Sequence, residues 1–274
     1  MRRRDARRYI AAFTLIEIIF AFVIIAILVA LVTIASQRAR KSASMAVSAN
    51  NLRQIAVGGV AYLGDNNQTF WKYAESTAAP QGTRWWFGFE SQSSLSAGEG
   101  NRSFDPREGP LGSYVPKGMM VDPAFAFTGK PFKPKYASGY FSIGYNLFLA
   151  GHTPGTGTGS GAWDPRPRFQ PSPIRFSQLH RPDQIVMFAT SAQVNDFQSP
   201  ANADNPMIEE FYGLDDSEVT LHGRFNGNVM VAYATGNVGF LPIDPLTIDK
   251  RAPEAKVGRF APVGDTKYLV DSEE

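Results

Sequence analysis

One long apolar run near the N-terminus restricts what this chain can fold into. Residues 13–35 form a stretch of 23 residues in which only Thr14, Glu17 and Thr33 fall outside the hydrophobic set. A helix of this length is about 34 Å long at 1.5 Å per residue, enough to cross a hydrocarbon core of about 30 Å. Because it is apolar on all sides, the run predicts a membrane-inserted helix rather than the core helix of a soluble domain.

The charges around the run predict its orientation. Without the first twelve residues the formal charge of the chain falls from +2 to −2, so a basic leader precedes a slightly acidic body. The positive-inside rule places the leader in the cytoplasm and the body outside it, although Arg38, Arg40 and Lys41 follow the run and reduce the bias. This charge balance does not favour binding of nucleic acid. The basic residues of the leader are Arg2, Arg3, Arg4, Arg7 and Arg8.

A secretory signal peptide is the first alternative for the N-terminus. Its apolar region would run only about 7–15 residues and end at a small-x-small cleavage site. The nearest such triplet, Ser44-Met45-Ala46, lies well past the end of the run. The sequence therefore favours a retained anchor.

Glu17 does not suit a plain anchor. A carboxylate within a membrane is costly, so an intramembrane acid is a functional candidate by default. The alternative is that Glu17, four residues into the run, lies near the interface and simply reaches water. In that case nearly any polar residue would serve there.

The leader and the start of the run carry a family resemblance. Arg7-Arg8-Tyr9-Ile10-Ala11-Ala12 followed by Phe13-Thr14-Leu15-Ile16-Glu17 resembles the class III leader of type IV pilins and type II secretion pseudopilins. The resemblance implies that a prepilin peptidase cuts between Ala12 and Phe13 and methylates the new amino group. It also implies that Glu17 meets the amine of a neighbouring subunit and sets the register of the filament. The family has Gly before the cut, where this chain has Ala12.

The residues after the run extend the predicted helix. No proline occurs before Pro80, and an amphipathic stripe continues to Leu63. Residues 13–63 as one helix resemble the long pilin helix, whose second half packs on a sheet, although the proline kink frequent in that family is missing. Gly58-Gly59 is expected to weaken the helix locally.

Residues 64–274 contain all 19 prolines and read as strands separated by long loops. Strand composition predicts strands at 140–150, 184–190, 228–234 and 237–241, with 184–189 as a central strand. The last two flank Thr235-Gly236 at the spacing of a two-residue hairpin. The predicted fold class is α+β and pilin-like: a leader (1–12), a long helix (13–63, membrane-spanning over 13–35) and an exported β-rich domain packed on the second half of the helix (64–274).

Several segments of the body resemble a branch of large pseudopilin-like proteins found in planctomycetes and verrucomicrobia, among them Gly109-Pro110-Leu111 with Tyr114, and Tyr145-Asn146. Val121-Asp122-Pro123 resembles a segment where that branch has Cys-Pro, so Asp122 replaces the Cys. Residues 222–238 resemble its C-terminal signature of His-Gly, Asn-Val and Asp-Gly, with Thr235 in place of the Asp. The signature residues, to which we assign a structural role, are His222, Gly223, Asn228 and Gly236.

Other patterns in the body have ordinary explanations. Residues 155–161 alternate glycine with threonine or serine but lack the Gly-Lys-Ser/Thr ending of a phosphate loop. A surface loop is therefore expected there. Residues 85–89 are strongly aromatic, which indicates packing on the sheet or, alternatively, a contact patch for a partner. No catalytic arrangement and no cofactor are expected, and the cysteine-free chain has no disulfide or thiolate site. Calcium is a minor candidate ligand for Asp215, Asp216 and Glu218.

These observations predict a non-enzymatic, pseudopilin-like subunit of a type II secretion or type IV pilus-like filament. It would be a single-pass protein of the inner (cytoplasmic) membrane with its body outside the cytoplasm. The expected partners are other pilin subunits, the prepilin peptidase, an inner-membrane assembly platform and membrane lipid, with no nucleic acid. Two alternatives stay open: an adhesive or DNA-uptake type IV pilin, and a tethered exported binding protein or enzyme that uses the same leader. A deep polar pocket around Trp85, Trp86 and His222 would favour the second.

Overall fold

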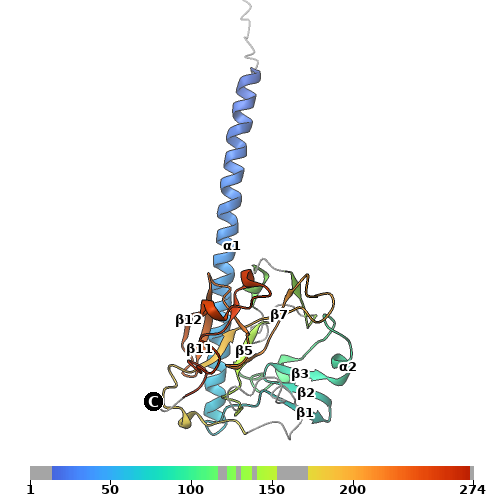
Figure 1. Ribbon diagram of the computed structural model, residues 1–274, viewed down its shortest axis with the longest axis vertical. Coiled ribbons are helices and arrows are strands. Elements are labelled where there is room, and N and C mark those ends of the chain that lie inside the picture. Colours follow the sequence, from blue (N-terminus) through green and yellow to red (C-terminus); the bar gives the residue numbers. More distant parts are fainter. Residues whose placement is uncertain (1–13, 117–121, 128–130, 138–140, 153–171, 272–274) are drawn as a thin grey trace, which may run out of the picture. The chain divides into compact units, whose positions relative to one another are not determined.

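The computed structural model describes residues 14–116, 122–127, 131–137, 141–152 and 172–271. Its contacts divide the chain into two compact units, 1–43 and 44–274. One helix, α1 (Leu15–Asp65), supplies the described part of the first unit and the beginning of the second (Figure 1). The long helix and the mostly β domain after it confirm the predicted α+β, pilin-like fold class.

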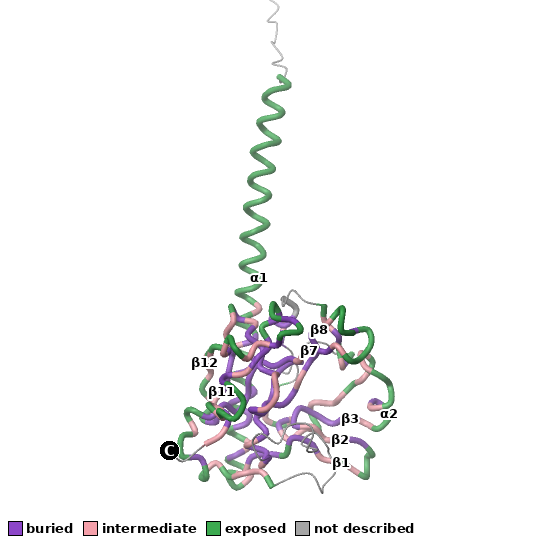
Figure 2. The backbone as a smooth tube through the Cα atoms, in the orientation of Figure 1, coloured by how far each residue is buried: buried purple, intermediate pink, exposed green. Residues whose placement is uncertain are grey.

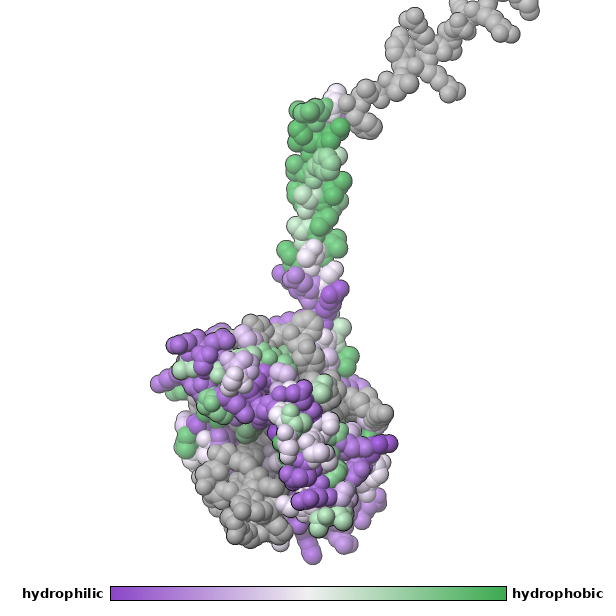
Figure 3. All heavy atoms as spheres, turned by 90° about the vertical axis from the view of Figure 1, so that its right-hand side faces the viewer, coloured by the Kyte–Doolittle hydropathy of each residue, from purple (hydrophilic) through white to green (hydrophobic). Residues whose placement is uncertain are grey.

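The first part of α1, residues 15–43, begins with the apolar run and is exposed throughout in the part of the chain that the structure describes. An 18-residue window of α1 has a mean hydropathy of 3.3 and none of it is buried. Figure 2 shows this part of the helix as exposed, and Figure 3 shows its hydrophobic surface giving way to hydrophilic residues at its end. Its large apolar side chains are mostly exposed; Leu15 is 77% exposed and Phe20 is 63% exposed. This part of the helix is therefore long and apolar enough to cross a membrane, and it is exposed, unlike the core helix of a soluble fold.

The described residues of the body form four sheets, in which most strand pairs are antiparallel. The largest is five-stranded in the order β12-β11-β6-β5-β9, and the others have the orders β1-β2-β3, β4-β8-β7 and β10-β13. Parallel pairs occur at β4–β8 and β5–β9. The strands are β1 (Ala74–Ala78), β2 (Gln81–Trp85), β3 (Gly88–Ser91), β4 (Phe132–Lys133), β5 (Ile143–Asn146), β6 (Val186–Thr190), β7 (Gln193–Asn195), β8 (Met207–Glu209), β9 (Gly213–Leu214), β10 (Leu221–His222), β11 (Asn228–Tyr233), β12 (Val238–Pro242) and β13 (Val257–Gly258).

Short helical turns connect these strands. The α-helical turn is α2 (Gln92–Leu95), and the 3₁₀ turns are η1 (Pro106–Glu108), η2 (Pro123–Phe127), η5 (Phe176–Gln178), η6 (Pro245–Thr247) and η7 (Pro253–Ala255). Several begin at an Asp or Ser whose side chain accepts a backbone N–H, as Asp105 does from Arg107 and Asp244 from Leu246.

The predicted strands of the main sheet are confirmed with small shifts. All five residues of β6 are buried at the centre of the sheet, as the continuous apolar run predicted. The β11–β12 connection differs from the predicted two-residue hairpin. Gly236 donates its N–H to the Tyr233 carbonyl at 2.8 Å, and the Tyr233 N–H donates to the Asn237 carbonyl at 2.9 Å. Three residues, 234–236, therefore lie between the hydrogen-bonded positions of the two strands. Gly236 has φ +87°, a left-handed conformation that favours glycine, so the turn places the Gly at its end rather than at its centre.

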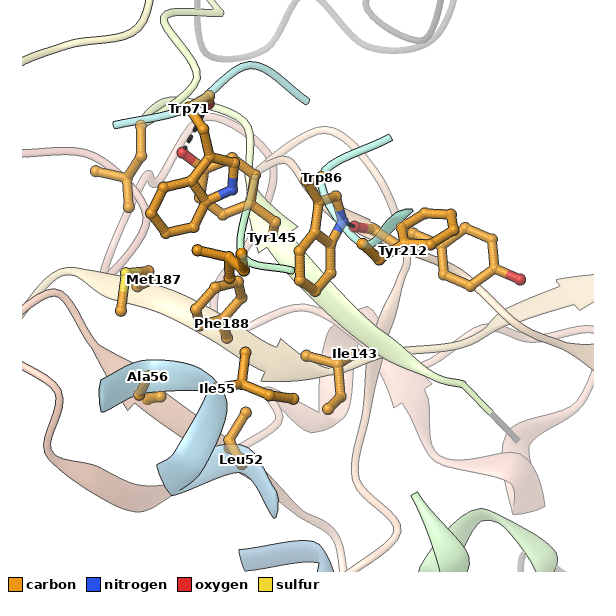
Figure 4. Close-up of a cluster of buried hydrophobic side chains, with 14 of the residues drawn as sticks. Leu52, Ile55, Ala56, Trp71, Trp86, Ile143, Tyr145, Met187, Phe188 and Tyr212 are labelled. Atoms are coloured by element: carbon orange, nitrogen blue, oxygen red, sulfur yellow. Dashed lines mark hydrogen bonds between the residues drawn. The ribbon is translucent and has the colours of Figure 1, made fainter. Parts of the chain in front are cut away.

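The second part of α1 belongs to the core of the body. Leu52, Ile55 and Ala56 face Ile143 and Phe188 of the main sheet (Figure 4). The helix runs unbroken through Gly58-Gly59, where weakening was expected. A Cβ on Gly58 would lie 2.6 Å from Val115 Cγ2, and one on Gly59 would lie 3.0 Å from Trp71 Cη2. These glycines therefore allow close packing that offsets their low helix propensity.

An aromatic cluster fills the space beside the helix. Trp71 stacks on Tyr145 with ring centroids 4.9 Å apart, and Trp86 lies 5.1 Å from Phe188. The Trp86 indole is fully buried and donates its N–H to the Tyr212 carbonyl at 2.8 Å (Figure 4). The aromatic segment 85–89 thus packs mainly inward. The opposite face of the sheet, including Val186, is covered by residues such as Ile243 and Phe260.

We predict that Ile55→Ala lowers the free energy of unfolding by about 2–5 kcal/mol, because it leaves a cavity between α1 and the sheet. Val57→Ala is the matched control on the same helix, since Val57 is 55% exposed and Ile55 is fully buried. Denaturant unfolding of the full chain in detergent, followed by tryptophan fluorescence, measures both variants. Equal losses from the two substitutions would contradict the packing of α1 on the sheet.

Candidate functional site

The N-terminal end of α1 contains a hydrogen-bonded motif centred on Glu17. Glu17 Oε2 accepts the Thr14 backbone N–H at 2.8 Å and the Thr14 hydroxyl at 2.8 Å. In return the Glu17 backbone N–H donates to Thr14 Oγ1 at 3.3 Å. This reciprocal arrangement is a capping box, which sequence analysis did not identify although the Thr-x-x-Glu spacing is its signature.

The capping box fixes where the carboxylate lies. Glu17 is in the first turn of α1 and exposed, at the end of the helix where unpaired N–H groups favour a negative charge. Ala12 and Phe13, the predicted cleavage and methylation residues, lie outside the described residues. Thr14 directly follows Phe13, so the hydrogen-bonded carboxylate lies within one helical turn of the proposed cut.

The C-terminal signature residues lie at strand ends in the body. His222 is on β10, 1% exposed, with its ring edge-on to Phe125 at 5.5 Å. Burial, followed by the Arg224 charge, lowers the pKa of His222 well below its ordinary value, and a contact with the Ala255 backbone acts the other way. Its ring is therefore neutral at pH 7 and packs within the core, away from solvent.

The glycines and the asparagine of the signature shape turns. A Cβ on Gly223 would lie 2.9 Å from the Gly227 backbone and from Ile243 Cδ1. Asn228 begins β11, and its backbone N–H donates to the Phe225 carbonyl at 3.1 Å. The signature thus forms the tight entry into β11 and the turn that leaves it.

A buried ion pair between Asp122 and Arg224 lies beside α1, and Asp122 also accepts a hydrogen bond from Ser48 of that helix. Sequence analysis did not find this pair. Arg224 Nη1 lies 2.6 Å from Asp122 Oδ2, with the two side chains only 1% and 2% exposed. Asp122 Oδ1 accepts the Ser48 hydroxyl of α1 and the Ala124 N–H. Arg224 Nη2 donates to the Ser142 and Ser191 carbonyls, at the ends of β5 and β6.

Charge and burial act in opposite directions at this pair. Burial lowers the pKa of Arg224 and outweighs the opposing effect of the Asp122 carboxylate, so the pKa falls to about 10. The guanidinium also lies 4.6 Å from the centre of the Phe125 ring. Asp122, which stands where the resembling branch has a Cys, therefore holds the second part of α1 against two strand ends.

Among the candidate calcium residues Asp215, Asp216 and Glu218, the Asp215 carboxylate is engaged by a neighbouring residue. Asp215 and Asp216 are buried, and Asp215 Oδ1 accepts the Ser217 N–H at 2.8 Å and hydroxyl at 2.6 Å. Within the part of the chain that the structure describes, no three His, Asp or Glu side chains gather as a metal site would require. The glycine-rich segment 155–161 lies outside the described residues.

Trp85, Trp86 and His222 do not share a pocket among the described residues. Trp85 lines a small cavity of about 170 Å³ with Arg102, Lys135 and several Tyr and Phe rings. Trp86 is fully buried and does not line this cavity, and His222 packs against Phe125. The arrangement that would favour a tethered enzyme or binding protein is therefore not formed by these three residues.

Comparison with known proteins identifies the N-terminus. Residues 7–33 match the family model of the prokaryotic N-terminal methylation motif. No curated protein and no solved structure matches the chain. The motif, together with the long apolar helix, fits a type IV pilin-like protein or pseudopilin. The leader motif and the α+β fold thus fit a pilin-like protein, with a helix long and apolar enough to anchor it in a membrane.

We predict that Arg224→Met lowers the free energy of unfolding by about 3–5 kcal/mol, because it leaves the Asp122 carboxylate buried and unpaired. The double variant Asp122→Leu/Arg224→Met should lose less than Arg224→Met alone. Arg107→Met is the control, since Arg107 pairs with Asp105 but is 72% exposed. Losses that simply add in the double variant would show that the two charges do not depend on each other.

Proposed function

We propose that the chain is a pseudopilin-like structural subunit of a type II secretion or type IV pilus-like filament. Its precursor would be cut by a prepilin peptidase between Ala12 and Phe13 and methylated on Phe13. The observation that carries the proposal is the methylation motif at 7–33 on a helix whose apolar first part is uncovered. An uncovered helix of this kind requires lipid before assembly and other apolar helices after it.

The position and charge of Glu17 support a role in assembly. Cleavage before Phe13 would create a terminal ammonium one helical turn from this carboxylate. Each charge is costly in an apolar layer, and a cation and an anion attract strongly there. Pairing of Glu17 with the amine of a neighbouring copy would fix the axial register, which a purely apolar helix cannot do.

The partners of this proposal follow from the same features. The leader would be recognised by the peptidase and the apolar helix by lipid, an inner-membrane assembly platform and other subunits. The leader arginines would hold the N-terminus in the cytoplasm, with the body on the other side of a single span. The role is mechanical, without catalysis or cofactor.

Intact-mass analysis of protein extracted from its native membrane tests the processing step. We expect a chain that lacks the first twelve residues and carries one added methyl group on Phe13. The control is a strain without prepilin peptidase, in which the full precursor should accumulate. A mature N-terminus near Ser44, or a full-length chain in the wild type, would contradict the proposal.

Variants of Glu17 separate an assembly role from helix capping. Glu17→Val should leave membrane insertion intact and abolish incorporation into filaments, measured by immunoblotting of sheared filaments. Glu17→Gln keeps an oxygen that caps Thr14 but removes the charge, so it should fail as well. Thr33→Val is the matched control, because the Thr33 hydroxyl donates to its own backbone at Val29. Normal incorporation of Glu17→Gln would show that capping alone accounts for Glu17.

A further inference from the structure

A buried lysine lies among carboxylates beside the sheet β4-β8-β7. The Lys133 side chain is 3% exposed, and its Nζ is in direct contact with the Glu99 carboxylate. Gln198 Oε1 lies 3.1 Å from the same nitrogen, and Glu209 Oε1 lies 3.7 Å from it. Glu209 is itself only 1% exposed.

The backbone holds these side chains together. Lys133 on β4 is directly opposite Glu209 on the parallel strand β8. The loop that carries Glu99 is fastened beside this strand, because the Gly100 N–H donates to the Lys135 carbonyl at 2.9 Å. The Ala137 N–H donates to the Arg102 carbonyl at 2.8 Å two residues further along. Contact between Lys133 and Glu99 is therefore built into the fold and does not depend on two free surface side chains meeting.

The surroundings suit a nucleophilic amine. Burial lowers the pKa of Lys133, and the positive charge of Lys135 lowers it further. The negative charge of Glu209 acts in the opposite direction. A larger neutral fraction makes a lysine a better nucleophile. Glu209 Oε2 is held by Gln193 Nε2 at 3.0 Å and by Asn195, which leaves Oε1 directed at the Lys133 and Lys135 ammonium groups.

We propose that Lys133 and Glu99 form an intramolecular amide bond, with Glu209 as the group that transfers the protons. The Lys133 ammonium first gives one proton, through Glu209, to a carboxylate oxygen of Glu99. The freed Nζ lone pair then attacks Cδ of Glu99, so an N–C bond forms and the C–O bond to that oxygen breaks. Glu209 accepts a proton from the attacking nitrogen and returns it to the departing oxygen. One ammonium and one carboxylate thereby give one amide and one water, with no oxidant, reductant or other co-reactant.

Such a bond would have a clear mechanical use. The chain has no cysteine, so disulfides cannot brace its exported body. An amide between residues 99 and 133 would covalently join the segment after α2 to the sheet β4-β8-β7. A cross-link of this kind restricts the unfolded chain as a disulfide does.

The test is mass spectrometry of the purified full chain under denaturing conditions. We expect a mass one water below that of the processed sequence, and a branched peptide after digestion that joins Glu99 to Lys133. The exposed pair Lys72–Glu75, 3.1 Å apart, is an internal control and should give unlinked peptides. A chain of full mass without a branched peptide would overturn the proposal. A branch from Lys133 to Glu209, or to Asn195 with loss of ammonia, would overturn the assignment to Glu99.

Two variants test the roles of the residues. Lys133→Arg keeps the positive charge and should restore the full mass. Glu209→Gln leaves Lys133 and Glu99 in place, so a full-mass chain from this variant supports proton transfer by Glu209. Complete cross-linking in Glu209→Gln would overturn that role. The wild-type result does not depend on whether either variant folds.

Discussion

The uncovered apolar surface of the first part of α1 is the constraint on which the rest of the molecule depends. A helix that exposes Leu15, Phe20 and their neighbours on every side is stable only in lipid or against other apolar helices. The roles proposed for the leader arginines and for Glu17 depend on this apolar environment. In water, Glu17 would be an ordinary helix-capping residue. In an apolar layer its negative charge is costly unless a positively charged group pairs with it.

The same helix changes role along its length. Beyond residue 43 its side chains enter the core of the body, where Leu52 and Ile55 meet the main sheet and Gly59 admits Trp71. The Asp122–Arg224 pair, with Ser48, adds a polar fastening beside this apolar contact. Within the body, the second part of α1 is therefore held both by apolar packing and by polar contacts, and both would resist a force applied along the helix.

Local patterns predicted local structure well. The apolar run gave the helix, the continuous run at 184–189 gave the central strand, and the β11–β12 hairpin followed from its strand composition. The details of the turn did not follow, because Thr235-Gly236 can occupy more than one turn type. Contacts between distant residues were not predicted: Asp122 and Arg224 are 102 positions apart, and no periodicity connects them. Glu99, Lys133 and Glu209 were missed for the same reason, since each reads alone as a surface charge.

The most direct test of the account is a structure of the assembled filament at a resolution that shows side chains. The measured quantity is the distance from the Glu17 carboxylate to the terminal nitrogen of Phe13 in the adjoining copy. The account predicts direct contact, at about 3 Å as in a charge-assisted hydrogen bond. A Glu17 that bonds only to its own Thr14, with the neighbouring nitrogen far away or still joined to Ala12, would contradict it.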